Sequence, residues 1–206
     1  MHGIQDNAGT FDLLIPHLPR GFYYVCIDLP GHGCSSSFHD GISLDFIDYV
    51  LTIVRVLKSL QWEACSFIGH SLGGQLGVYL CSLWPQLVNK LILIDAIAPA
   101  ALETKHYLSR HKHLLDDIFK REERFTENNV PNYTYKEALE RVISNRRSTL
   151  SIKGGEALIK RSLKENGLGG YRFTTDQRLK AGLWTGLNED QQRKVSISFI
   201  VSQIAS

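Results

Sequence analysis

The sequence comprises 206 residues, of which 43% are hydrophobic and 21% are charged, proportions typical of a single globular domain. Its net charge of +2 is too small to indicate a nucleic-acid-binding protein. No stretch approaches the roughly 18 consecutive apolar residues of a membrane span, and "MHGIQDNAG" at the N-terminus lacks the basic and apolar regions of a signal peptide. We therefore expect no transmembrane segment and a cytoplasmic location, with an organelle matrix such as the peroxisome left open.

The first hundred residues alternate between strand-like and helix-like patterns. Short, nearly continuous apolar runs predict buried strands at 22–29, 65–69 and 90–95. Apolar residues spaced by three or four predict a helix that begins with Ser43 as its N-cap, and another that follows Ser71 and ends before Pro85. Strands that alternate with helices over short connections form a parallel sheet, so we expect this part to be α/β.

The rest of the chain is predicted to be mainly helical. Periodic segments separated by proline and glycine predict helices at 109–125, 135–147 and 154–166. The last segment is ambiguous, because "VSISF" alternates as a strand would, whereas Asn188 is a suitable helix N-cap; we favour a helix. Residues 101–206 carry a net charge of +6, but acidic residues are interspersed with the basic ones, which favours solvated helix faces over a phosphate-binding site.

The stretch "GHSLGG" at 69–74 lies between a predicted buried strand and a predicted helix. In this context Gly-x-Ser-x-Gly indicates a nucleophile elbow, a tight turn that exposes the hydroxyl group of Ser71. Side chains at Gly69 and Gly73 would clash with neighbouring elements. The helix behind Ser71 directs the amide of Leu72 toward a reacting oxygen. Ser71 is therefore the candidate catalytic nucleophile.

Two further stretches accompany this motif. "HGIQDN", from His2, resembles the His-Gly oxyanion loop of the α/β-hydrolase superfamily, and "IDLPGHGCSS" (27–36) resembles the loop after the fourth strand of the same superfamily. Over residues 2–100, and more loosely through "GGYRFTTDQRL" (169–179), the sequence resembles the animal serine hydrolase-like proteins. The resemblance implies a small-molecule ester or related acyl substrate, a second oxyanion donor in the amide of Ile4, and neither metal nor cofactor.

The residues that would activate Ser71 are harder to find. In the resembled superfamily an acid and then a histidine follow the serine, but the last of the eight histidines is His113. A histidine at the start of the lid is the remaining alternative: His106, His111 or His113. Asp95 occupies a position that a minority of the superfamily uses for the acid, whereas Asp28 is expected to fix the loop after its strand.

The resemblance also implies strands that this sequence lacks at both ends, so we expect a shortened form of a complete hydrolase. The expected fold class is α/β, an incomplete α/β-hydrolase parallel sheet of about three strands with a helical lid. We expect a core with the nucleophile elbow at 1–100, the lid at 101–186 and a segment of uncertain fold at 187–206. Two functions stay open: a serine hydrolase acting through Ser71, or a catalytically inactive form with a binding or regulatory role. The sequence predicts neither the exact substrate nor the oligomeric state.

Overall fold

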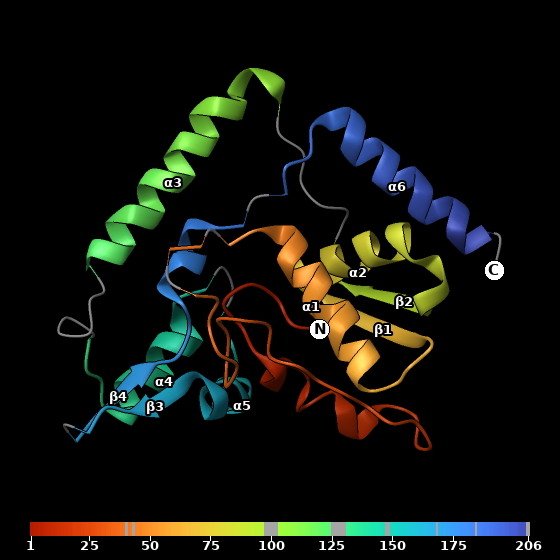
Figure 1. The fold of residues 1–206 in the computed structure, drawn as a ribbon. Coiled ribbons are helices and arrows are strands. Elements are labelled where there is room, and N and C mark those ends of the chain that lie inside the picture. The colour runs from red at the N-terminus through yellow and green to blue at the C-terminus, as the bar shows by residue number, and fades with distance from the viewer. Residues whose placement is uncertain are drawn as a thin grey trace.

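The computed structural model of the chain describes residues 1–39, 41–42, 44–96, 103–124, 131–146, 149–167, 169–183 and 185–204, with the backbone alone for 197–204. Its centre is a two-stranded parallel sheet formed by β1 (Cys65–His70) and β2 (Val88–Ile94), which helix α2 (Leu72–Leu83) connects (Figure 1). The register pairs Ser66 with Lys90 and His70 with Ile94. The predicted strand, helix and strand around Ser71 are thereby confirmed.

The main apolar core is formed by this sheet together with α1 (Phe46–Ser59) and α2. Tyr49 of α1 and Leu76 of α2 are fully buried in it, next to Phe67 of β1. Helix α1 is capped by Asp45, whose side chain accepts a hydrogen bond from the amide of Ile47 (3.0 Å). The N-cap is therefore Asp45; the predicted cap, Ser43, lies outside the described residues.

Residues 22–29 do not form the predicted buried strand. Phe22 and Tyr23 are 69% and 79% exposed, and the amide of Leu29 donates to the imidazole of His2 (2.9 Å) instead of to another strand. An apolar run becomes a buried strand only where neighbouring strands pair with its backbone, and no described strand pairs with this one.

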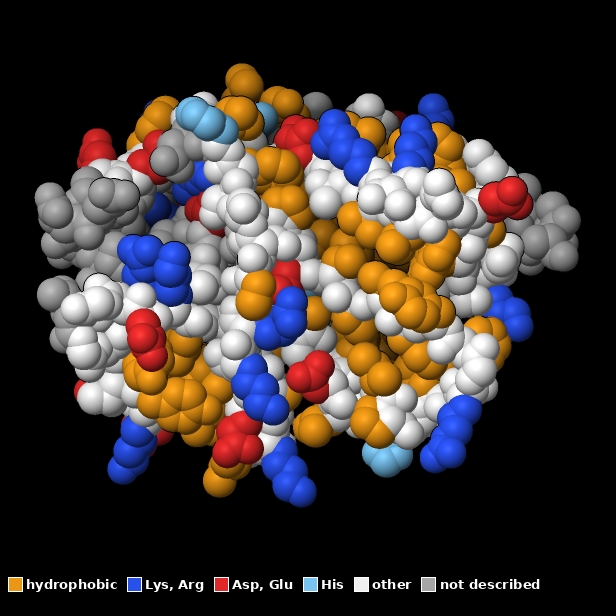
Figure 2. All heavy atoms as spheres, turned by 60° about the horizontal axis from the view of Figure 1, so that its bottom comes forward, with side chains coloured by type: hydrophobic (Ala, Val, Ile, Leu, Met, Phe, Trp, Pro, Cys, Tyr) orange, Lys and Arg blue, Asp and Glu red, His pale blue; other side chains and the backbone are white. Residues whose placement is uncertain are grey.

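Strand β2 is also less buried than predicted. Ile92 and Ile94 share one face of the sheet and are 49% and 37% exposed, because α2 packs on the opposite face, where Leu91 meets Gly77. Figure 2 shows apolar side chains gathered over a broad area of one face of the molecule.

The second half of the chain forms the helices α3 (Tyr107–Arg124), α4 (Tyr135–Ser144) and α5 (Ile152–Ser162), as predicted. The predicted helix at 154–166 ends early, however, because residues 163–173 form an antiparallel hairpin of β3 (Leu163–Glu165) and β4 (Tyr171–Phe173). Gly167, with φ at +73°, opens the turn after Asn166. Asn-Gly between two short strands is a hairpin signal that the helical periodicity obscured.

Helix α6 (Glu189–Ile204) confirms the helix predicted for the last segment, with Asn188 as its N-cap. Asn188 and Gln191 form a reciprocal capping box, each side chain accepting a hydrogen bond from the other's amide. The helix packs along α2 (Figure 1), where Ser82 Oγ donates to the carbonyl of Val195 (3.1 Å).

Short 3-10 helices complete the described elements: η1 (Ala8–Phe11), η2 (Ile15–His17), η3 (Pro85–Leu87), η4 (Thr104–His106) and η6 (Gln177–Ala181). None of the described helices is long and apolar enough to cross a bilayer.

Candidate active site

Ser71 occupies the sharp turn between β1 and α2. Its backbone angles, φ 49° and ψ −116°, belong to a region that residues with a side chain rarely adopt. The amide of Ser71 donates to the carbonyl of Ile94 (3.1 Å), and its carbonyl accepts hydrogen bonds from Gly74 and Gln75 at the start of α2. These contacts hold the strained geometry that a nucleophile elbow requires.

The glycines around Ser71 are required by close backbone contacts. A Cβ atom at Gly69 would lie 2.5 Å from the carbonyl oxygen of Gly73, and one at Gly73 would overlap the carbonyl oxygen of Met1. A Cβ at Gly77, further along α2, would lie 2.7 Å from Leu91 of β2. The glycines thus allow the elbow, the N-terminal loop and the sheet to pack together, as predicted for Gly69 and Gly73.

The N-terminal loop lies directly against the elbow. Met1 runs beside β1, because its amine donates to the carbonyl of Ile68 (2.6 Å) and its carbonyl accepts from the amide of His70 (2.9 Å). A Cβ atom at Gly3 would lie 3.2 Å from Cβ of Ser71. The amide of the next residue, Ile4, and that of Leu72 have no acceptor among the described residues. Both amides are therefore available to a bound oxygen atom.

Two buried histidines fix this loop. Nε2 of His2 accepts from the amide of Leu29 (2.9 Å), so its Nδ1 carries the proton and donates to the carbonyl of Gly3 (2.8 Å). Burial, and then the neighbouring His32 ring, lower the pKa of His2 to about 3. Burial also lowers the pKa of His32. Both imidazoles are neutral at physiological pH, which suits the structural roles expected of them.

Asp28 joins the N-terminal loop, the loop after residue 29 and helix α5. Its carboxylate accepts from the amides of Ala8 and Cys34 (both 2.7 Å) and pairs with the guanidinium of Arg161 (2.8 Å). Burial alone would raise the pKa of Asp28, but the hydrogen bonds from Arg161 and the two amides outweigh it and lower the pKa. Asp28 is thus a structural acid, as expected from the sequence.

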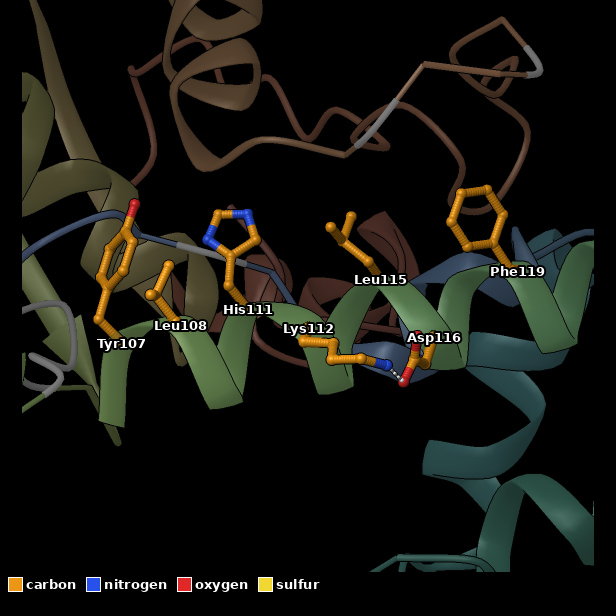
Figure 3. Close-up of a pocket in the computed structure, with 7 residues that line it drawn as sticks. All are labelled: Tyr107, Leu108, His111, Lys112, Leu115, Asp116 and Phe119. Atoms are coloured by element: carbon orange, nitrogen blue, oxygen red, sulfur yellow. Dashed lines mark hydrogen bonds and ion pairs between the residues drawn. The ribbon is translucent and has the colours of Figure 1, made fainter. Parts of the chain in front are cut away.

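The structure brings no imidazole to Ser71. Oγ of Ser71 makes no hydrogen bond with any described residue, and Nδ1 of the adjacent His70 is buried against Gly3 without a partner in the described chain. His111 lines an open groove of about 500 Å³ along α3, beside Tyr107 (Figure 3). His106 and His113 are exposed. The three lid histidines are therefore not hydrogen-bonded to Ser71.

Asp95 lies beside the elbow but does not orient a base. It follows Ile94, whose carbonyl accepts from the amide of Ser71, and has φ at +44°. Its side chain is exposed, with no hydrogen bond or ion pair to a described residue. No group of three or more histidine, cysteine, aspartate or glutamate side chains in the described ranges is arranged to hold a metal ion. A catalytic role for Asp95 stays a prediction.

The family of the chain follows from comparison with known proteins. Residues 1–147, which include the elbow and the N-terminal loop, match the family model for the alpha/beta hydrolase fold. The chain belongs to the α/β-hydrolase family. The predicted fold class, an incomplete parallel sheet with helical elements, is confirmed.

Two serine hydrolase-like proteins and one solved structure show how far the similarity extends. This α/β-hydrolase is 34% identical over 192 residues to a serine hydrolase-like protein of Danio rerio, and 35% identical over 183 residues to serine hydrolase-like protein 2 of Homo sapiens. The alignments cover 93% and 87% of the chain but 58% and 56% of those proteins. The crystal structure of a hypothetical protein from Pseudomonas aeruginosa matches with a TM-score of 0.84 at 30% identity, covering 96% of the chain and 67% of that protein. The chain therefore spans little more than half the length of these curated relatives.

The predicted site residues divide into two groups in this α/β-hydrolase. Ser71, Leu72 and the Gly3–Ile4 loop lie together, whereas Asp95 and the lid histidines do not complete a catalytic triad. The sequence reasoning missed Arg178, which is 5% exposed, pairs with Asp176 (2.7 Å), and donates to the carbonyls of residues 38, 39 and 42. It also missed Arg161 as the partner of Asp28. The sequence gives no signal for either role, because Asp28 lies far from Arg161 in the chain and residues 38, 39 and 42 lie far from Arg178.

Proposed function

We propose that the protein is a serine hydrolase of ester-like acyl substrates in which Ser71 is the nucleophile. The observation that carries this proposal is the strained backbone of Ser71, with φ at +49°, supported on both sides by glycines that admit no side chain. Membership of the α/β-hydrolase family and similarity to serine hydrolase-like proteins support it.

The chemistry would proceed through an acyl-enzyme. Oγ of Ser71 would bond to the carbonyl carbon of the substrate, while the amides of Leu72 and Ile4 would stabilise the negative oxygen that develops. The ester bond would then break, and the proton from Ser71 would leave with the alcohol. Water would next cleave the Ser71 acyl ester to release the acid. Residues 1–100 would supply this machinery, and residues 101–186 would form a lid over it.

The rate of hydrolysis of a neutral p-nitrophenyl acyl ester tests the proposal. The full chain is expected to hydrolyse the ester faster than Ser71→Ala, and Ser66→Ala, a change at an exposed position of β1, is expected to match the parent. Circular dichroism confirms that each variant is folded. Equal rates for the folded parent and for Ser71→Ala would contradict the proposal.

A second candidate function is favoured by the absence of a hydrogen bond between Ser71 Oγ and the imidazole of any described histidine. A protein with the elbow and the oxyanion amides, but without a base, would bind acyl groups and turn them over slowly, and loss of a base in such sites leaves only about 10³-fold acceleration over water. Binding of the acyl ester by calorimetry, with equal slow hydrolysis by the parent and Ser71→Ala, would favour this binding role over catalysis.

A further inference from the structure

A cavity of about 1260 Å³ lies beside the oxyanion loop. Ile4, Gln5 and Asp6 form part of its wall, with Ser35 and Ser37 of the loop after residue 29, and the helices α3 and α4, the β3–β4 hairpin and η6 contribute most of the remainder. Ser71 does not line the cavity, but Ile4 follows Gly3, which lies against Ser71, so one wall of the cavity is formed by the loop that contacts the candidate nucleophile. We call it the basic pocket. The cations that line it are Arg121, Arg124, Arg141, Arg146, Lys164, Arg172 and Lys180, of which Arg121 and Arg146 form ion pairs with Asp117 and Asp6.

Few carboxylates offset this positive charge. Asp6 is the only acidic residue among the described residues that line the pocket, and its carboxylate is bound to Arg146 at 2.6 Å. Asp117 pairs with Arg121 at 3.0 Å from outside the lining. From the sequence, acidic residues interspersed with the basic ones favoured solvated helix faces. In the structure, none of the described acidic residues of 101–206 lines the basic pocket.

Arg141 projects into the pocket from α4 without an ion pair to a described carboxylate. Its guanidinium lies 4.8 Å from the centre of the Tyr133 ring, which fixes its position by a cation–π contact. Glu137, one turn earlier on α4, instead caps the helix by accepting hydrogen bonds from the amide and hydroxyl of Thr134 (2.8 and 2.9 Å). Both acceptor contacts hold Glu137 at the helix start, and no ion pair between Glu137 and Arg141 is formed, although the two charges still attract each other.

The hairpin places two cations directly opposite each other. Lys164 of β3 is the cross-strand partner of Arg172 of β4, and both side chains line the basic pocket. Neither has an ion pair with a described acidic residue. Like charges directly opposite on one face of an antiparallel pair are destabilising. An anion bound between them would relieve this repulsion.

Lys180 of η6 also lines the basic pocket. Its pKa is lowered, first by partial burial and then by the charges of Arg121, Arg124 and Arg141. Three guanidinium groups from two helices therefore act on one ammonium group. The cations are concentrated in one place by the fold although they are scattered in the sequence.

We propose that the basic pocket binds a small phosphate-bearing group, which would be the leaving-group part of the acyl substrate of Ser71. The second half of this statement rests on the proposed function; the binding of phosphate does not. Arginine guanidinium groups bind phosphate through two parallel hydrogen bonds, and Lys164 and Lys180 add point charges. A cavity somewhat larger than the roughly 300–1,000 Å³ of ordinary small-molecule sites suits a molecule that carries more than one phosphate.

Isothermal titration of the full chain with inorganic pyrophosphate tests the proposal. Pyrophosphate is expected to bind, and the double variant Lys164→Gln/Arg172→Gln is expected to bind at least about tenfold more weakly, since two charge-assisted contacts are lost. Lys136→Gln/Lys153→Gln makes the same change of charge at exposed positions that do not line the pocket, and should bind within about twofold of the parent. Lys180→Gln serves as a second pocket variant.

A thermal melt of each variant separates binding from folding. The Lys164/Arg172 variant should melt no lower than the parent without pyrophosphate, because a like-charge pair is removed. Ser71→Ala should bind pyrophosphate as the parent does, so a failure of catalysis leaves the pocket proposal intact, and a failure of binding leaves the nucleophile proposal intact.

Succinate and a dodecamer of thymidylate distinguish other anions. Binding of pyrophosphate in preference to both supports the proposal. No binding of pyrophosphate at millimolar concentration, equal weakening in both double variants, tighter binding of succinate, or binding of the oligonucleotide alone would each overturn it.

Discussion

At the scale of single residues, the contacts around Ser71 restrict its backbone conformation more than its side chain. The residue has φ at +49°, and the neighbouring glycines allow the carbonyls of Met1 and Gly73 to approach. This part of the site was predictable, because a turn with such contacts excludes all but a few residue types. The absence of an imidazole at Ser71 was also foreseeable from the histidine positions. The roles of Arg161 and Arg178 were not, because the groups that they bind, Asp28 and the carbonyls of residues 38, 39 and 42, are distant from them in the sequence.

Replacement of Gly73 by alanine is expected to destabilise the protein by about 2–4 kcal/mol, because the new Cβ would overlap the backbone of residues 1 and 2. Gly154→Ala is the matched control. A Cβ at Gly154, in the first turn of α5, would meet no atom closer than 3.4 Å, so this variant should be neutral or slightly stabilising. Urea denaturation measures both; an equal effect of the two changes would contradict the role given to Gly73.

His2 is expected to make stability depend on pH. Its pKa is about 3 in the folded protein, below the ordinary value of 6.5, so the unfolded chain binds more protons between these values. The stability that His2 contributes is complete above pH 6.5 and falls as the pH drops toward 3, by up to about 1.4 kcal/mol per pH unit. His2→Gln should reduce this slope by about one proton. Urea denaturation at several pH values measures it, and the same slope in the parent and in His2→Gln would contradict this account.

At the level of secondary-structure elements, the sequence predicted the helices, because their formation depends on residues close together in the chain. The helix after Ser71 and the capping of α6 by Asn188 follow from periodicity and cap chemistry, and both are present. The segment at 22–29 has a strand-like composition but no described pairing partner. The β3–β4 hairpin was missed because the apolar spacing of α5 was extended through its turn. Strand pairing depends on a second segment, so composition alone predicts it less well than helix.

Arg161 is expected to contribute to the attachment of helix α5 to the rest of the molecule, in addition to the hydrogen bonds from Asn7 to Leu158 and Ser162. Asp28 has a side chain that is 1% exposed, so Arg161→Gln would leave a buried carboxylate with only two amide donors. We expect a loss of about 2–3 kcal/mol, at the low end for buried pairs because the Arg161 side chain is 39% exposed and thus partly screened. Lys160→Gln, at the adjacent exposed position, should change stability by less than about 0.5 kcal/mol. If thermal or urea denaturation showed comparable losses of stability for Arg161→Gln and Lys160→Gln, the role given to Arg161 would be contradicted.

At the scale of the whole molecule, residues 101–186 meet residues 1–100 through polar contacts between residues far apart in the sequence. Arg161 binds Asp28, Arg146 binds Asp6, and Asn7 donates to the carbonyl of Leu158 (2.9 Å). These contacts bring the basic pocket next to the oxyanion loop. The arrangement was invisible in the sequence, where a net charge of +6 over residues 101–206 is distributed among several helices and a hairpin. The family and the elbow could be predicted, whereas the convergence of cations could not.

The central claim is that Ser71 is a nucleophile, and covalent labelling tests it most directly. The full chain would be treated with a fluorophosphonate probe, which reacts with activated serines, and the adduct would be located by peptide mass spectrometry. The account predicts one adduct, on Ser71, and none on folded Ser71→Ala, with Ser66→Ala labelled as the parent is. Folded parent protein that stays unlabelled, or an adduct on any residue other than Ser71, would contradict it.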